Sequence, residues 1–122
     1  MKKILFIEDE PNLQKTVGEI LRAEGFEILE ATDGEAGILL AKARHPDIIL
    51  LDIILPKKDG FEVMKELKED PETARSKIIV LTNLESSSDV ERALALGATT
   101  YLVKANYNLE DVVAKIKQIL GE

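Results

Sequence analysis

The feature that most constrains this chain is the alternation of five short apolar runs with five longer segments whose apolar residues recur every three or four positions. A period of three to four indicates an amphipathic helix, whereas a short continuous apolar run is typical of a buried strand. The runs are ILFI, EILEA, DIILLD, KIIVLT and TYLV. The periodic segments predict helices around residues 13–21 and 36–43 and at 61–68, 88–96 and 109–120.

Several of these predicted strands are apolar at every position, as in ILFI and IILL. A strand with no polar face is typical of a parallel sheet that helices cover on both sides. Alternating strands and helices therefore predict a doubly wound α/β domain. A length of 122 residues, with no linker or internal repeat, favours one domain over residues 1–122 and no output domain.

The composition excludes several classes of protein. The chain has no cysteine, so disulfides, cysteine nucleophiles and cysteine-bound zinc are ruled out. Its net charge of −7 opposes attraction to nucleic acid and to anionic lipid. The first apolar run is too short for a signal peptide, and no later run approaches the length of a membrane span. We therefore expect a cytoplasmic protein with no direct nucleic-acid binding and no membrane insertion.

Helix boundary residues support the predicted elements. Asp33 is placed to cap the helix of residues 36–43, and Ser88 with Glu91 forms a candidate capping box for the helix of residues 88–96. Gly25 and Gly97 follow predicted helices, where a left-handed residue commonly ends the helix.

Polar side chains stand where four of the predicted strands end. Ligands of open parallel sheets bind beyond the carboxyl ends of the strands, so these side chains are candidates for one site. They are Glu8, Asp9, Asp52, Thr82 and Lys104. Clustered carboxylates repel one another unless a cation neutralises them, and an oxygen-only ligand set with few carboxylates suits Mg²⁺. Each residue alone also fits an ordinary role, as a solvated loop acid, a strand threonine or a surface lysine.

Four stretches of the chain resemble the receiver domain of two-component response regulators, in the stand-alone form of the chemotaxis regulators: ILFIEDEP, IILLDIILPKKDG, IIVLT and GATTYLVK. In the second stretch, Pro56 and Gly60 follow Asp52 by four and eight positions, a spacing similar to that of the family. The resemblance covers almost the whole chain. It implies a flavodoxin-like (βα)5 domain with a parallel five-stranded sheet in the order 2-1-3-4-5.

The resemblance also implies a role for the acidic residues. Asp52 would accept a phosphoryl group from the phosphohistidine of a sensor histidine kinase or phosphotransfer protein, or from a small acyl phosphate. Mg²⁺ would be held by Glu8, Asp9, Asp52 and the backbone carbonyl of Ile54. The protein would be a phosphoacceptor switch that takes part in its own phosphorylation and dephosphorylation, and not an enzyme.

The remaining implied roles concern the response to phosphorylation. Thr82 would hydrogen-bond the phosphoryl group, Lys104 would pair with it, and Tyr101 would change rotamer on activation. A downstream protein target would bind the surface formed by residues 88–96, Tyr101 and residues 109–120.

Three residues depart from the family pattern, and one of them is Asn83, which follows Thr82 where a small residue is common. Glu8 stands where the family usually has Asp, which moves the carboxylate outward by one methylene. Ala105 stands where the family usually has a cis proline after the lysine. A cis bond before a residue other than proline costs about 3 to 4 kcal/mol, so the sequence leaves the Lys104–Ala105 bond open between cis and trans.

Three other functions fit parts of the sequence. Haloacid-dehalogenase-type phosphatases use an aspartyl nucleophile, but their second acid falls where this chain has Ile54. A nucleotide- or flavin-binding domain needs a glycine- or hydroxyl-rich phosphate loop, whereas the first strand here leads into EDEPN. A receiver-like interaction module that is not phosphorylated is the third alternative.

Overall fold

The structure is a computed structural model that describes residues 1–121, and it contains five strands, five α-helices and one 3₁₀ turn. The strands are β1 (Lys3–Ile7), β2 (Glu27–Ala31), β3 (Ile48–Leu51), β4 (Lys77–Thr82) and β5 (Thr100–Val103). The helices are α1 (Pro11–Ala23), α2 (Gly34–Arg44), α3 (Gly60–Glu69), α4 (Ser87–Ala95) and α5 (Leu109–Leu120), and η1 (Lys104–Asn106) is the 3₁₀ turn.

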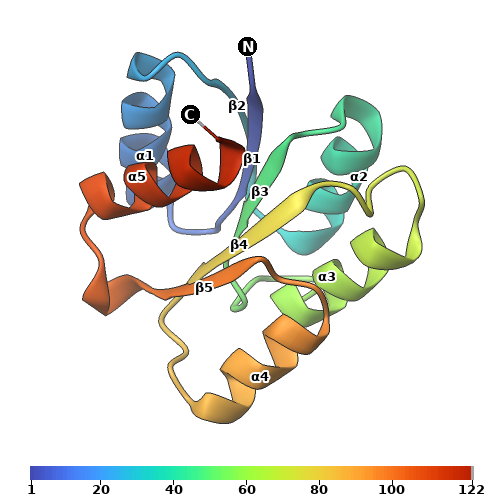
Figure 1. The fold of residues 1–122 in the computed structure, drawn as a ribbon. Helices are drawn as coiled ribbons and strands as arrows, with labels where there is room; N and C mark the ends of the chain where they lie inside the picture. The colour runs from blue at the N-terminus through green and yellow to red at the C-terminus, as the bar shows by residue number, and fades with distance from the viewer. Residues whose placement is uncertain (122) are drawn as a thin grey trace.

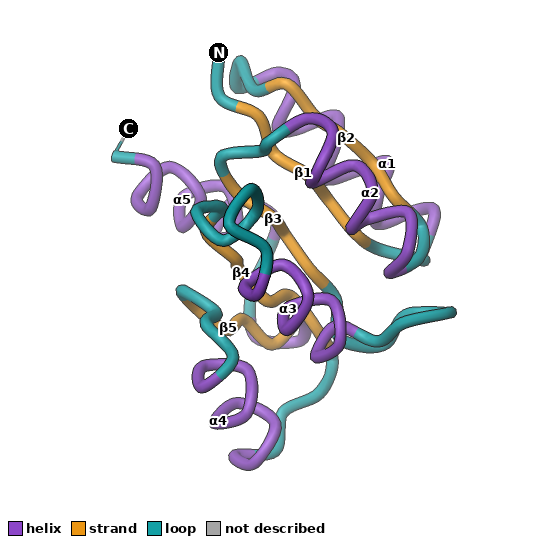
Figure 2. Tube along the Cα trace, turned by 90° about the vertical axis from the view of Figure 1, so that its right-hand side faces the viewer, coloured by secondary structure: helices purple, strands orange, loops and turns teal. Residues whose placement is uncertain are grey.

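The five strands form one parallel sheet in the order β2-β1-β3-β4-β5. This confirms the predicted flavodoxin-like topology. The central strand β3 is buried at all four positions because helices cover both sides of the sheet. Figure 1 shows α1 and α5 on one side of the sheet and α2, α3 and α4 on the other. In Figure 2 the helices α2 and α3 lie toward the viewer, over the strands.

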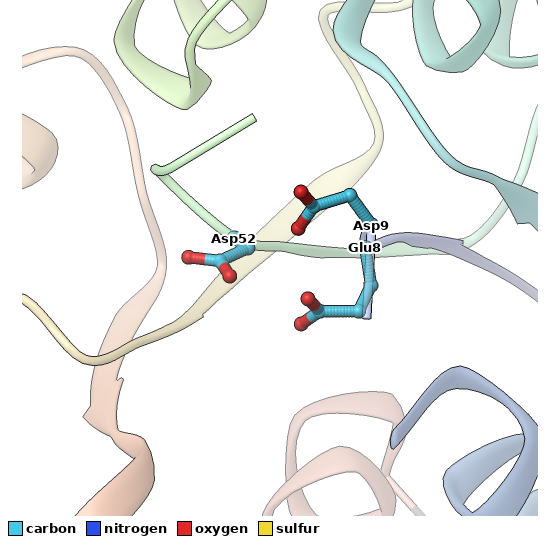
Figure 3. Close-up of side chains that lie close together, drawn as sticks. All are labelled: Glu8, Asp9 and Asp52. Atoms are coloured by element: carbon cyan, nitrogen blue, oxygen red, sulfur yellow. The ribbon is translucent and has the colours of Figure 1, made fainter. Parts of the chain in front are cut away.

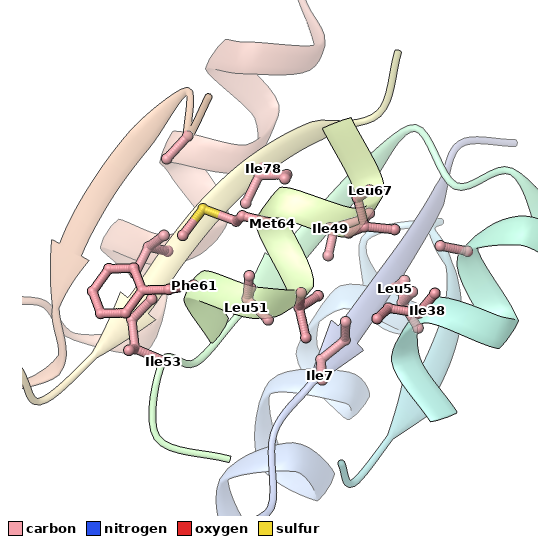
Figure 4. Close-up of a cluster of buried hydrophobic side chains, with 14 of the residues drawn as sticks. Leu5, Ile7, Ile38, Ile49, Leu51, Ile53, Phe61, Met64, Leu67 and Ile78 are labelled. Atoms are coloured by element: carbon pink, nitrogen blue, oxygen red, sulfur yellow. The ribbon is translucent and has the colours of Figure 1, made fainter. Parts of the chain in front are cut away.

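Alternate residues of the central strands face two separate apolar clusters. Leu5 and Ile7 of β1 point into the cluster beneath α2 and α3, together with Phe61 and Met64 (Figure 4). Their neighbours along β1 point into a second cluster, beneath α1 and α5, whose members include Val17. Because successive strand residues face opposite sides, one buried strand anchors both helical layers.

The predicted helix ends are correct in most respects. The carboxylate of Asp33 accepts a 2.8 Å hydrogen bond from the Ala36 amide and caps α2. Gly25 and Gly97 have positive φ angles of 96° and 105°, which glycine adopts without steric cost.

The predicted capping box of Ser88 and Glu91 is wrong. The helix α4 begins at Ser87, and Ser86 is its cap, accepting a 3.2 Å hydrogen bond from the Asp89 amide. The reason is positional: a capping hydroxyl must precede the first helical residue, and Ser88 already lies within the first turn.

None of the helices within residues 1–121 combines the length and the apolarity that crossing a bilayer requires.

Candidate functional site

Asp52 lies directly after β3, at the carboxyl edge of the sheet, and is only 4% exposed. Its amide continues the sheet by donating a 3.1 Å hydrogen bond to the Ile7 carbonyl. One carboxylate oxygen, Oδ1, accepts a 3.2 Å hydrogen bond from the Ile54 amide. The apolar strand therefore delivers one carboxylate to the sheet edge and holds it rigidly there.

Two further acids, Glu8 and Asp9, follow β1, the neighbouring strand. Glu8, Asp9 and Asp52 each bring a carboxylate oxygen to within 4.8 Å of the other two. Figure 3 shows these side chains converging from the ends of the two strands. Glu8 is 1% exposed, whereas Asp9 is exposed to solvent. The predicted acidic cluster is therefore present, with one open side.

Lys104 lies between two of these acids. Its Nζ is 2.9 Å from Asp52 Oδ2 and 2.9 Å from Glu8 Oε1. Burial opposes the charged form of this lysine, but the hydrogen bond to Asp52 and the negative charges of Asp52 and Glu8 outweigh burial and raise the pKa of Lys104. The structure contains no cis peptide bond within residues 1–121, so the Lys104–Ala105 bond is trans.

The pKa of the Glu8 carboxyl group is subject to opposing effects. Burial raises the pKa of its carboxyl group, the Lys104 ammonium lowers it, and repulsion from Asp52 raises it again, so that the net direction is upward. Oε2 accepts a 3.2 Å hydrogen bond from the Glu10 amide. Oε1 is buried and, among the described residues, accepts no hydrogen bond of regular geometry, despite its proximity to Lys104.

These observations fit a divalent cation. The three acids each bring a carboxylate oxygen to within 4.8 Å of the other two, Glu8 Oε1 is buried without a regular hydrogen bond, and a single ammonium cannot balance all three charges. Hard oxygen ligands with solvent access on one side suit Mg²⁺, which retains several of its waters.

Thr82 and Tyr101 are connected through the chain between β4 and α4. Thr82 is fully buried at the end of β4, and its hydroxyl accepts a 3.4 Å hydrogen bond from the Leu84 amide. The Tyr101 hydroxyl donates a 2.8 Å hydrogen bond to the Leu84 carbonyl. Burial, and then the charges of Asp89 and Asp52, raise the pKa of the Tyr101 phenol. The two predicted switch residues therefore bond to the same residue, Leu84.

Sequence reasoning missed Gln14 of α1. Its side chain is 7% exposed and its Nε2 points at the carbonyl oxygens around the end of β1. The available signal was its place on the inward face of α1, with Val17, Gly18 and Leu21 at helical spacing.

Comparisons with known proteins agree with this geometry. The family model described as "Response regulator receiver domain" matches residues 4–117. The transcriptional regulatory protein CpxR of Klebsiella pneumoniae is 39% identical over 120 residues, which are 98% of this chain and 50% of CpxR. The chain spans about half the length, or less, of the curated relatives that it matches.

Solved structures share the whole fold. A two-component response regulator from Clostridium difficile matches with a TM-score of 0.92 and 30% identity, covering 100% of this chain and 98% of that one. The receiver domain of the sensor histidine kinase PA1611 from Pseudomonas aeruginosa matches with a TM-score of 0.88 and 28% identity, covering 99% and 98%. That structure has a magnesium ion in its active-site cleft.

Proposed function

The chain belongs to the response regulator receiver domain family of two-component signalling, and we propose from that premise that Asp52 is its phosphoryl acceptor. The observation that carries the proposal is the buried Asp52 carboxylate, paired with Lys104 and facing two further acids. The Lys104 ammonium, together with a cation held by the acids, suits an attack on phosphorus, because the negative charge of the arriving phosphoryl group must be neutralised.

In the proposed reaction, a carboxylate oxygen of Asp52 attacks the phosphorus of a phosphohistidine on a sensor kinase or phosphotransfer protein. A phosphorus–oxygen bond forms, the phosphorus–nitrogen bond breaks, and the imidazole leaves with the electron pair. A small acyl phosphate would react in the same way, with its carboxylate as the leaving group. Lys104 offsets the charge of the phosphoryl oxygens, and Thr82 supplies a hydroxyl to one of them.

The metal proposed for the site is Mg²⁺, with Glu8, Asp9, Asp52 and the carbonyl of Ile54 as the residues that would hold it. When bound, Mg²⁺ supplies positive charge against the phosphoryl oxygens. Glu8 is the least direct of these ligands, because its Oε1 faces Lys104.

The proposed switch begins at Thr82. An aspartyl phosphate adds charge and acceptor oxygens beside the Thr82 hydroxyl, which now accepts a hydrogen bond from Leu84. Moving that hydroxyl would release the Leu84 amide, while the Leu84 carbonyl is the partner of Tyr101. Phosphorylation would thereby change the surface of α4, β5 and α5, to which we assign the downstream protein target. The protein would be a switch that takes part in its own phosphorylation and dephosphorylation, and not a catalyst for other substrates.

Intact-mass measurement after incubation with acetyl phosphate and Mg²⁺ tests the proposal. We expect the parent protein to gain one phosphoryl group and Asp52→Ala to gain none. Asp47→Asn is the matched control, because Asp47 lies at the opposite end of the same strand, where its carboxylate accepts a hydrogen bond from the Lys3 amide. No mass gain by the parent at saturating donor would favour a receiver-shaped module that is not phosphorylated.

A further inference from the structure

Gln14 places a polar side chain in the otherwise apolar contact between α1 and the sheet. Its amide nitrogen lies 2.9 Å from the Ala31 carbonyl oxygen, 3.3 Å from that of Glu8 and 3.4 Å from that of Phe6. A side-chain amide carries two hydrogens, so these three carbonyls share two donors. The side chain thus ties α1 to the ends of both β1 and β2.

The carbonyls that Gln14 contacts surround the start of the loop that carries the acids. The Glu8 amide donates a 3.0 Å hydrogen bond to the Ala31 carbonyl, which also accepts from Gln14. The Glu8 carbonyl accepts from Gln14 in turn. Both ends of the Glu8 residue are therefore held, one through β2 and the other directly by the side chain of Gln14.

Holding this backbone also orients the acids. The Glu8 carbonyl belongs to the peptide group that leads into Asp9, so fixing it restricts the direction in which the Asp9 side chain leaves the chain. We propose that Gln14 is a positioning residue for the metal site, which sets the direction of the Glu8 and Asp9 carboxylates through the backbone of the β1–α1 loop. This inference rests on the proposed Mg²⁺ binding, and Gln14 itself does not touch the ion.

A merely structural role makes a different prediction. If the amide only satisfied buried carbonyls, its loss would weaken the fold without changing the geometry of the acids. Loss of an outer partner that orients metal ligands instead weakens metal affinity by about 10- to 100-fold. Affinity for Mg²⁺ and stability of the protein without Mg²⁺ therefore have to be measured on the same variants.

The test variant is Gln14→Met, which keeps the length of the side chain and removes both donors. The control is Val17→Ala, a cavity on the same face of α1, because Val17 is 2% exposed and has no part in the loop. Calorimetric titration with magnesium chloride gives the affinity, and urea unfolding without Mg²⁺ gives the stability. We expect Gln14→Met to bind Mg²⁺ at least about tenfold more weakly than the parent, whereas Val17→Ala is destabilised but keeps the parent affinity.

Equal Mg²⁺ affinity in Gln14→Met and the parent would overturn the inference while leaving the proposed function intact. No Mg²⁺ binding by the parent would contradict the metal in the proposed function itself, and this inference with it. If Gln14→Met does not fold, nuclear magnetic resonance of the parent protein tests the inference. The side-chain amide resonances of Gln14 should shift as Mg²⁺ is added. Unchanged resonances at saturating Mg²⁺ would refute the positioning role.

Discussion

The ammonium of Lys104 donates a 2.9 Å hydrogen bond to the Asp52 carboxylate at the carboxyl edge of the sheet. The Lys104 side chain is only 14% exposed, so the pair is largely shielded from water. The same ammonium also faces Glu8, which means that one cation stabilises two buried acids.

Replacing Lys104 by Met should therefore be strongly destabilising. Removal of one partner of a buried ion pair costs about 3 kcal/mol, because the other charge is left without compensation. Urea unfolding without Mg²⁺ measures the loss, and added Mg²⁺ should restore part of it. The control is Lys117→Met, whose half-exposed pair with Glu24 should contribute less than about 1 kcal/mol. Similar losses in the two variants would contradict this account of the site.

The ionisation of Tyr101 should report its burial. In Tyr107→Phe, Tyr101 is the one remaining tyrosine, and its absorbance titration should have a midpoint above the ordinary value of 10.0. Because the folded pKa is raised, the contribution of Tyr101 to stability is complete below pH 10 and is lost as the pH rises through the folded pKa. Asp89→Asn should lower the midpoint, since the Asp89 charge is one of its causes. A midpoint at or below 10.0 would show that the phenol is not held in this buried position.

Replacement by alanine should change the stability of the fold in opposite directions at Gly60 and at Gly18. A Cβ at Gly60 would lie 2.6 Å from the Ile53 Cα and 2.7 Å from the Asp52 carbonyl oxygen, so Gly60→Ala should destabilise the fold by about 1 to 3 kcal/mol. It should also slow phosphorylation, because the backbone that must shift carries Asp52. A Cβ at Gly18 would meet only the flexible ends of Glu30 and Arg22, and alanine is the better helix former by about 1 kcal/mol. Thermal unfolding measures both effects. A melting temperature of Gly60→Ala equal to or higher than that of Gly18→Ala would refute the prediction.

Lys57 has a positive φ of 67°, in the loop between β3 and α3. The left-handed conformation costs a residue with a Cβ about 1 to 2 kcal/mol, whereas glycine adopts it freely and loses about 0.5 to 1 kcal/mol in backbone entropy. The exposed ion pairs of Lys57 with Asp33 and Glu35 contribute little. Lys57→Gly should therefore raise the melting temperature. Lys57→Ala, which removes the charge and keeps the Cβ, should not, and an equal gain in both variants would mean that the charge was responsible.

Ile54 should lengthen the life of the phosphorylated state. Its side chain is apolar and 55% exposed, two residues beyond Asp52, and we expect it to hinder the approach of water to an aspartyl phosphate there. Ile54→Asn should speed phosphate release after the donor is removed, as followed by intact mass. Leu39→Asn is the control, because Leu39 is an exposed leucine on α2. An unchanged decay rate in Ile54→Asn would exclude this role.

Sequence patterns predicted the element order, the parallel sheet and the acidic cluster, because each of these follows from local periodicity and from where the strands end. The strand register then brought the acids together: Ile7 pairs with Leu51, so Glu8 and Asp52 emerge side by side. The carboxyl ends of parallel strands all lie at one edge of the sheet, which is why the sequence pattern predicts one site for residues that are far apart in the chain.

Other features depend on contacts that no local pattern encodes. Lys104 bridges Glu8 and Asp52, and its bond to Ala105 is trans. Tyr101 bonds the Leu84 carbonyl, and Gln14 reaches the carbonyls of Phe6, Glu8 and Ala31. Each requires a particular rotamer of one side chain against the side chains or the backbone of another segment. The sequence by itself therefore determined which residues gather at the sheet edge. Only the tertiary structure decided which of them bond to one another. The reason is that a hydrogen bond depends on atomic positions to within tenths of an ångström, whereas periodicity indicates only which face of a helix or strand a residue occupies.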